Sequence, residues 1–166
     1  ILCLPPHQIQ SLLPIIEVPT DTRPILNVHF GLTEEHPLPE DAPFMGIING
    51  TSQWLFRRAN ILSVTVSNAS VFVEKDTDEL VKLIWREISH IISCPKMPLP
   101  NHRVVMEKRA TISQTPEQNA LRPDSVTKWK NLYLAGDWTN TGLPATIESA
   151  VQSGQIAAEN LSNSLT

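Results

Sequence analysis

Residues 131–154 read NLYLAGDWTNTGLPATIESAVQSG, a short apolar run followed by a Gly-Asp turn, a polar loop and a segment rich in small residues. The run Leu132–Ala135 is continuously apolar, which is typical of a strand covered on both faces and therefore predicts a parallel strand. Gly136 allows the backbone to turn tightly or to approach a ligand closely. Asp137 follows at the carboxyl end of the strand, where open α/β folds bind nucleotide cofactors and where a carboxylate can accept hydrogen bonds from sugar or ribityl hydroxyls.

The second half of this stretch predicts a helix over residues 145–161 with Pro144 in its first turn. Proline suits that position because it lacks the N–H that would be unpaired there, and the N–H groups of Ala145 and Thr146 are then expected to point outward. Such donors favour a negatively charged ligand. One side of the helix is thin enough to lie against a flat ring system, since it carries Ala150, Ser153, Gly154, Ala157 and Ala158. The residues alone leave open an ordinary helix packed on a sheet, with Asp137 as a cap.

Four segments, in order along the chain, resemble one enzyme family. The stretch LAGDWTNTGLPATIESAVQSGQIAAE resembles the C-terminal flavin-contacting motif of the FAD-dependent amine oxidase and phytoene desaturase superfamily. Within that superfamily the chain is most similar to the squalene-associated FAD-dependent desaturase family, also described as the hydroxysqualene dehydroxylase family. The other three similar segments are PILNVHF at 24–30, PFMGIINGTSQWLFRR at 43–58 and KRATISQTPEQNALRP at 108–123. The resemblance covers most of the chain.

This resemblance implies an FAD-dependent oxidoreductase that acts on an isoprenoid, with conversion of hydroxysqualene to squalene in hopanoid biosynthesis as the first expectation. Carotenoid desaturation of the phytoene type and flavin amine oxidation are the alternatives within the superfamily. A non-enzymatic module that binds an apolar ligand or a partner is the alternative from another class. No catalytic residue is assigned, because flavin chemistry can proceed without a paired nucleophile and base.

The resemblance also implies which residues contact FAD. The acid at the Asp137 position is expected to bind the ribityl or phosphate-linking part of the cofactor. Backbone donors at the start of the following helix are expected to face the pyrimidine edge of the flavin. The cofactor-binding residues implied in this way are Gly136, Asp137, Trp138, Pro144, Ala145 and Thr146.

The superfamily's Gly-rich strand-turn-helix, which holds the FAD pyrophosphate, is not found in this sequence. The chain has six glycines, and none are spaced as G-x-G-x-x-G. Because the sequence also begins at Ile1 without a methionine, it is expected to be the C-terminal part of a longer enzyme. The isolated piece is expected to be inactive, to hold FAD weakly if at all, and to self-associate through uncovered apolar surface.

The sequence pattern predicts a mixed α+β fold in three parts. Residues 1–23 form an N-terminal helix and linker, residues 24–100 a substrate-binding lobe, and residues 101–166 the C-terminal part of an FAD-binding lobe that contributes a strand and a helix. The substrate lobe is expected to be an antiparallel sheet built from the strands Ile25–Phe30, Met45–Ile48, Gln53–Arg57 and Ile61–Ser67.

Local signals refine this organisation. Asn49-Gly50 predicts a tight hairpin turn, because both residues tolerate a positive φ. Apolar residues at three- and four-residue intervals predict a helix that begins at Asp76 or Thr77 and covers one face of the sheet. The later segments are expected to be a strand at Arg103–Ala110 and a loop at Ser113–Lys130.

Trp54 and Phe56 are the candidate substrate-binding residues. Their spacing of two places them on the same face of a strand. An isoprenoid is almost entirely hydrocarbon, so its binding depends on apolar burial worth about 25 cal/mol per Å². Packing in the core of the sheet is the open alternative for both side chains. Arg109 and Arg122 flank a loop and could stabilise its carbonyls, pair with acids or approach phosphate.

Composition excludes several function classes. A net charge of −4 and a pI near 5.7 argue against nucleic-acid binding. The two cysteines and five histidines show no metal-ligand spacing, so no metal site is expected. No apolar stretch reaches the roughly 18 residues that span a bilayer, so any membrane contact is expected to be peripheral. The expected location is cytoplasmic, either free or peripheral to the inner membrane.

Overall fold

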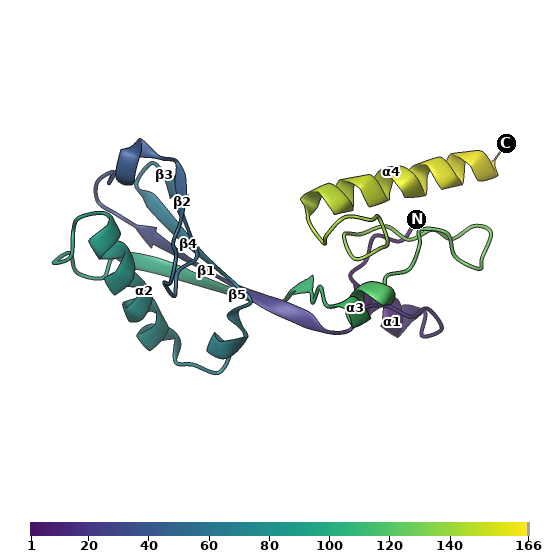
Figure 1. The fold of residues 1–166 in the computed structure, drawn as a ribbon, viewed down its shortest axis with the longest axis horizontal. Helices are drawn as coiled ribbons and strands as arrows, with labels where there is room; N and C mark the ends of the chain where they lie inside the picture. The colour runs from purple at the N-terminus through teal and green to yellow at the C-terminus, as the bar shows by residue number, and fades with distance from the viewer. Residues whose placement is uncertain (166) are drawn as a thin grey trace. The chain divides into compact units, whose positions relative to one another are not determined.

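The computed structural model describes residues 1–165, which form two compact units (Figure 1). The first unit combines Ile1–Thr22 with the described residues from Thr111 onward, and the second comprises Arg23–Ala110. The N-terminal segment therefore packs with the C-terminal part of the chain and is not a separate linker. The assignment of the two parts as substrate and cofactor lobes stays a prediction.

The second unit is built on a five-stranded sheet in the order β2-β3-β4-β1-β5. Its pairs β1–β4, β3–β4 and β2–β3 are antiparallel, as the alternating sequence pattern predicts. The buried positions of β1 and β4 alternate along each strand, because successive side chains point to opposite faces. The strands are β1 (Thr22–Gly31), β2 (Phe44–Gly46), β3 (Trp54–Arg58), β4 (Ile61–Ser67) and β5 (Asn101–Ile112).

Helix α2 (Thr77–Ile91) covers one face of this sheet (Figure 1). It begins as predicted, because the Asp76 side chain accepts a hydrogen bond from the N–H of Glu79 at 2.9 Å. Its apolar side joins the core formed by the buried side chains of β1, β3 and β4. The Phe30 and Trp85 rings lie 5.0 Å apart within that core. The opposite face of the sheet is left free of a helix from this unit.

The expected tight turn at Asn49-Gly50 is wrong. The pair of β2 and β3 residues nearest the turn is Gly46 with Trp54, so the two strands are connected by the longer loop 47–53. Asn49 does adopt a positive φ of 61°. The loop is held by Glu87 of α2, whose carboxylate accepts from the N–H groups of Thr51 at 3.0 Å and Ser52 at 2.8 Å. This distant carboxylate satisfies backbone donors that a two-residue turn would have paired locally.

In its described residues, the first unit contains three helices and little regular sheet. They are α1 (Pro6–Leu12), α3 (Pro116–Ala120) and α4 (Ile147–Ser164). The expected strand at 131–135 is present only as single bridges, which join Leu134 to Leu2 in parallel and Tyr133 to Val126 in antiparallel fashion. Pairing with Leu2 stays short because Pro5 already caps α1 three residues later. Two short 3-10 helices lie in the other unit, at Pro39–Asp41 and Ala69–Phe72.

Helix α3 corrects the expectation of an uninterrupted loop from Ser113 to Lys130. The Thr115 hydroxyl accepts a hydrogen bond from the N–H of Gln118 and so caps the helix, and Pro116 occupies its first position. Pro116 excludes a long helix through this segment. It is also a favourable start for a short one.

Candidate functional site

The turn after Ala135 is shaped by Gly136. The Gly136 N–H donates to Ser153 Oγ of α4 at 2.8 Å, and its carbonyl accepts from the N–H and the hydroxyl of Thr139. Its φ is 154°, which side chains rarely adopt, and an added Cβ would lie only 2.7 Å from Trp138 Cδ1. The position therefore requires glycine.

Arg122 holds the loop that follows. Its Nη1 donates to the carbonyl of Leu143 at 2.7 Å, and its Nη2 donates to the carbonyls of Asp137 at 2.9 Å and Thr139 at 2.6 Å. Of the roles that the sequence left open for Arg122, the structure shows the stabilisation of carbonyls. Burial lowers the pKa of Arg122, and the nearby Asp137 charge opposes that shift. One cation thus fixes three backbone groups on both sides of Asn140.

Two buried serines complete the support of this loop. The Ser149 hydroxyl donates to the Asp137 carbonyl at 3.2 Å and pairs with the Thr141 hydroxyl at 2.7 Å. The hydroxyl of Ser153, one turn later on α4, accepts a hydrogen bond from the Gly136 N–H. Sequence reasoning treated Ser153 only as a small residue and did not single out Ser149. Their spacing of four on one helix side was the available signal, since buried hydroxyls require partners.

Asp137 lies half-buried at the edge of a cleft of about 410 Å³. Burial raises the pKa of its carboxyl, while the charge of Arg122 and the backbone N–H groups of Asp137 and Trp138 act in the opposite direction. The carboxyl group is thus neither walled off nor fully solvated. The cleft is lined by Cys3, Leu4, Pro5, Ala135, Gly136, Asp137, Trp138, Ala150 and Gly154.

Helix α4 begins later than the sequence predicts. Thr146 is the N-cap, in extended conformation, and its hydroxyl accepts from the N–H of Ser149. Pro144 and Ala145 therefore precede the helix, and the Ala145 N–H donates to Gln114 Oε1 at 3.3 Å. The Ala145 N–H is therefore paired within the protein and is not the free helix-start donor that the sequence predicts. The Thr146 N–H lies at the N-cap, where helix-start donors have no partner within the helix, and its expected role stays a prediction.

Trp138 is anchored in the interior. Its side chain is 2% exposed, and its Nε1 donates to the carbonyl of Leu4 at 3.0 Å. It packs in a cluster with Ile9, Val18 and Leu134. Its indole N–H is already paired, so any contact with a ligand in the cleft would have to come from the ring. The expected role of Trp138 as a cofactor contact stays a prediction.

Trp54 and Phe56 lie on the face of the sheet opposite α2, where each is 43% exposed. They are therefore not core residues. Phe44 of β2, which is 53% exposed, joins them, with its ring 6.3 Å from Trp54 and 5.9 Å from Phe56. Three aromatic rings thus form an open apolar wall, which we call the aromatic wall. Phe44 was missed by sequence reasoning because only the strand pairing brings it beside Phe56.

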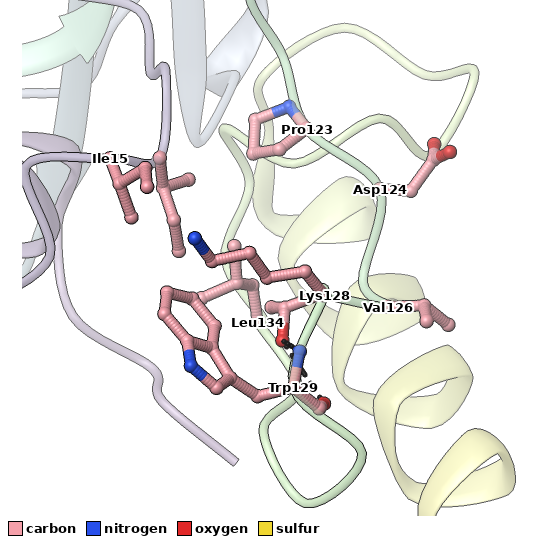
Figure 2. A pocket seen from close by; sticks show the side chains of 9 residues that line it. Ile15, Pro123, Asp124, Val126, Lys128, Trp129 and Leu134 are labelled. Carbon is pink, nitrogen blue, oxygen red and sulfur yellow. Dashed lines mark hydrogen bonds between the residues drawn. The ribbon is translucent and has the colours of Figure 1, made fainter.

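A smaller concavity of about 210 Å³ lies between Ile15 and Ile16, which follow α1, and the loop 123–129 (Figure 2). Figure 2 shows Lys128 extending over Trp129, with its amino group 4.7 Å from the ring. The one acid there, Asp124, accepts from the Asn140 side chain at 3.1 Å. Its lining is mostly aliphatic and aromatic, without convergent polar groups, so the Asp137 cleft is the better candidate site.

A family model for flavin-containing amine oxidoreductases matches residues 3–162. The chain belongs to this family. Hydroxysqualene dehydroxylases of Rhodopseudomonas palustris and Zymomonas mobilis are 47% and 46% identical to it over 159 residues. The match covers 96% of this chain but only 37% of each relative. Plant 15-cis-phytoene desaturases are more distant, at 22–24% identity.

A solved structure from Exiguobacterium sp. 255-15, described as a candidate protoporphyrinogen oxidase, shares the fold. It superposes with a TM-score of 0.69 over 99% of this chain and 40% of its own, at 14% identity. At that identity the likeness concerns the fold alone. This likeness and the observed sheet confirm the predicted mixed α+β fold with an antiparallel sheet.

The residues around Asp137 fit a flavin-containing group. The cleft combines one half-buried carboxylate with the small residues Ala150 and Gly154 of α4. A Cβ added at Gly154 would meet no heavy atom within 4 Å, so the helix surface there is open to a flat group. In the first turn of α4, Ile147 is 86% exposed. Asp137 and the exposed start of α4 are the parts of this chain that could hold the cofactor.

Other features of the described chain bear on function more weakly. Among residues 1–165, no three His, Cys, Asp or Glu side chains gather as a metal ion would require. Within the same residues, no helix is both long and apolar enough to cross a bilayer. Arg109 is exposed on β5, and its backbone N–H donates to the Glu107 carboxylate at 3.0 Å.

Asp137→Asn is expected to raise the melting temperature at pH 7 more than at pH 3. The folded carboxyl has a pKa above its ordinary value of 3.8, so its ionised form is less favourable in the fold than in the unfolded chain. This penalty is small when both states are protonated and is complete once the pH exceeds the raised pKa. Thermal denaturation of both proteins at the two pH values measures the difference. Equal shifts at both pH values would show that the carboxyl is not desolvated.

Proposed function

We propose that the whole protein is an FAD-dependent hydroxysqualene dehydroxylase, which converts hydroxysqualene to squalene. The chain spans about 37% of the length of its curated relatives, so this activity concerns more than the residues described. The observation that carries the proposal is the Asp137 cleft beside the start of α4, in a chain 47% identical to a protein of that name.

In this proposal the chain supplies one side of the cofactor site. Asp137 accepts hydrogen bonds from hydroxyls of the cofactor's ribityl or phosphate-linking part. The N–H groups at the start of α4 face negative charge on the flavin, which a helix N-terminus stabilises by about 0.3–1 kcal/mol at the surface. The bound flavin supplies the two-electron chemistry. Arg122, Ser149 and Ser153 keep the loop around Asp137 in one conformation, so that its carboxylate is positioned before the cofactor binds.

The aromatic wall supports an isoprenoid as the substrate class. Phe44, Trp54 and Phe56 present a continuous apolar surface on a sheet face that no helix of their unit covers. A large hydrocarbon gains binding energy mainly from such burial, at about 25 cal/mol per Å². The wall alone suits phytoene equally well. Dehydroxylation ranks above desaturation because the dehydroxylases are twice as similar in sequence as the phytoene desaturases.

The test is to incubate the whole protein, loaded with FAD, with hydroxysqualene and a reductant. Squalene formation, followed by gas chromatography, is the expected result. Asp137→Ala should weaken FAD retention about 10- to 100-fold, because a hydrogen bond to a charged group contributes about 1.5–3 kcal/mol. Glu159→Ala is the matched control, since it removes an exposed carboxylate from α4 on the same unit.

Three outcomes would contradict the proposal. A yellow protein that forms no squalene but dehydrogenates phytoene would indicate a carotenoid desaturase. Oxidation of amines would indicate the amine oxidase reaction. Failure of the whole protein to bind any flavin, together with tight binding of squalene, would favour a non-enzymatic apolar-ligand module. Unchanged FAD occupancy in Asp137→Ala would remove Asp137 from the site without affecting the choice of reaction.

A further inference from the structure

The open face of the sheet carries a polar strip beside the aromatic wall. The strand register places side chains on this face in two rows that run across the strands. One row is Phe44, Phe56, Ser63 and His29, and the next is Gly46, Trp54, Thr65 and Asn27. In both rows the aromatic residues lie on β2 and β3, and the polar residues lie on β4 and β1. The face is therefore divided into an apolar half and a polar half.

The polar half consists of two hydrogen-bonded pairs. The Thr65 hydroxyl donates to Asn27 Oδ1 at 2.7 Å, and His29 Nδ1 lies 2.8 Å from Ser63 Oγ. All four side chains are half-buried. Neighbouring strands are about 5 Å apart, so the pairs begin one strand away from the indole of Trp54 and the ring of Phe56.

Each pair still has hydrogen-bonding capacity directed to no protein group. Among residues 1–165, the Asn27 Nδ2 amide and His29 Nε2 have no protein partner. If His29 Nδ1 carries the proton, the Ser63 hydroxyl remains a donor and Nε2 an acceptor. In the other tautomer these roles are exchanged. In either state the His29–Ser63 pair offers one donor and one acceptor, which is the complement of an alcohol.

We propose that this face recognises an isoprenoid alcohol, with the aromatic wall on its hydrocarbon and the Asn27–Thr65 and His29–Ser63 pairs on its hydroxyl group. The proposal rests on the proposed function, which it deepens by assigning the residues that distinguish hydroxysqualene from squalene. A wall of hydrocarbon alone would bind substrate and product equally. The polar strip supplies the difference, because a hydrocarbon bound over it would cover the free polar groups of Asn27 and His29 without offering them a hydrogen-bond partner.

The charges on this face favour a neutral head group over a phosphorylated one. Neither pair contains a lysine or an arginine, the residues that commonly bind diphosphates. Arg58, which follows Phe56 by two residues on β3, is the cation nearest in register and lies outside both rows. On β5, Val104 and Met106 pack against the core, so alternation places Arg103, Glu107 and Arg109 on the open face, where the Glu107 carboxylate accepts from the Arg109 N–H. An alcohol is therefore the class that the strip fits.

The test compares the binding of hydroxysqualene and squalene to the whole, FAD-loaded protein. The variant Asn27→Leu/Thr65→Val keeps the shape of one pair and removes its polar atoms. It should weaken hydroxysqualene binding about three- to tenfold, as expected for a lost hydrogen bond, and leave squalene binding unchanged or tighter. Ser63→Ala should act in the same direction. Phe56→Ala should instead weaken both ligands by a similar factor, and it keeps Trp54 as the emission probe. Tryptophan emission, melting temperature and flavin content provide the binding signal and the controls for folding.

The two proposals fail in different ways. If the wild-type protein forms squalene but the strip variants keep the full preference for hydroxysqualene, the strip is not the recognition surface and the function stands. If no squalene forms but the variants still lose the preference for the alcohol, the function fails and the strip stands. Tighter binding of farnesyl diphosphate than of farnesol would overturn the assignment of a neutral alcohol. If no ligand changes the emission of Trp54, other protein covers this face of the sheet. The face would then not be the binding surface for any isoprenoid.

Discussion

Gly136→Ala is expected to lower the free energy of unfolding by about 2–4 kcal/mol. Two costs add at this position. The φ of 154° is strained for any residue with a side chain, and the new methyl group would collide with the indole of Trp138. That indole cannot move aside, since it is 2% exposed and its N–H is bonded to the Leu4 carbonyl. Urea denaturation of the wild-type and variant proteins measures the loss.

Gly154→Ala is the matched control for this prediction. Gly154 lies inside α4, and its added Cβ would meet no heavy atom within 4 Å. Alanine there should stabilise the helix by up to about 1 kcal/mol. The two glycine variants should therefore shift stability in opposite directions. A Gly136→Ala protein as stable as the wild type would mean that the turn before Asp137 does not rest against Trp138.

The elements that the sequence predicts well are those in which short-range spacing carries the information. Strands β3 and β4 lie within one residue of their predicted bounds, helix α2 begins at a predicted residue, and β1 begins three residues earlier than predicted. Each of these elements buries one face along its length. This burial produces the alternation in the strands and the three- to four-residue periodicity in the helix. The Asp76 cap is likewise a local bond, over three residues.

The features that the sequence could not place depend on partners distant along the chain. The run at 131–135 forms only single bridges, because what it pairs with is Leu2 and Val126. The loop 47–53 takes its shape from Glu87, more than thirty residues away. No local pattern in either segment encodes these partners. At the start of α4, the sequence allows a helix that begins at either Pro144 or Thr146. The helix begins at Thr146 because its hydroxyl accepts a hydrogen bond from the N–H of Ser149.

The candidate site divides in the same way. The Gly-Asp turn and the small residues of α4 could be identified from sequence, and the cleft brings Gly136, Asp137, Ala150 and Gly154 together. That Trp54 and Phe56 share a face also follows from spacing. Their exposure and the polar strip beside them do not, because both require the register between strands. Arg122 was recognisable as a candidate, but three carbonyl partners can be read only from coordinates.

Arg122→Met is expected to lower the free energy of unfolding by about 3–5 kcal/mol and to release the loop around Asp137. Methionine keeps much of the aliphatic stem but removes the guanidinium donors of Thr139 and Leu143 and leaves the Asp137 carbonyl with the Ser149 hydroxyl alone. Arg122→Lys should recover only part of the loss, because one ammonium group cannot reproduce the planar arrangement of guanidinium donors. Urea denaturation measures the stability, and FAD retention by the whole protein measures the loop.

Arg57→Met separates this effect from the general loss of an arginine. Arg57 pairs with Asp41 at 2.8 Å and Glu35 at 3.9 Å, and both acids are largely exposed. Such a pair contributes at most about 1 kcal/mol, since water already solvates its acids. The Arg122 variant should therefore lose several times more stability and should also lose FAD, whereas the Arg57 variant should keep it. Equal losses in the two variants would mean that the loop around Asp137 holds its conformation without the Arg122 guanidinium, through Ser149 and Ser153 alone.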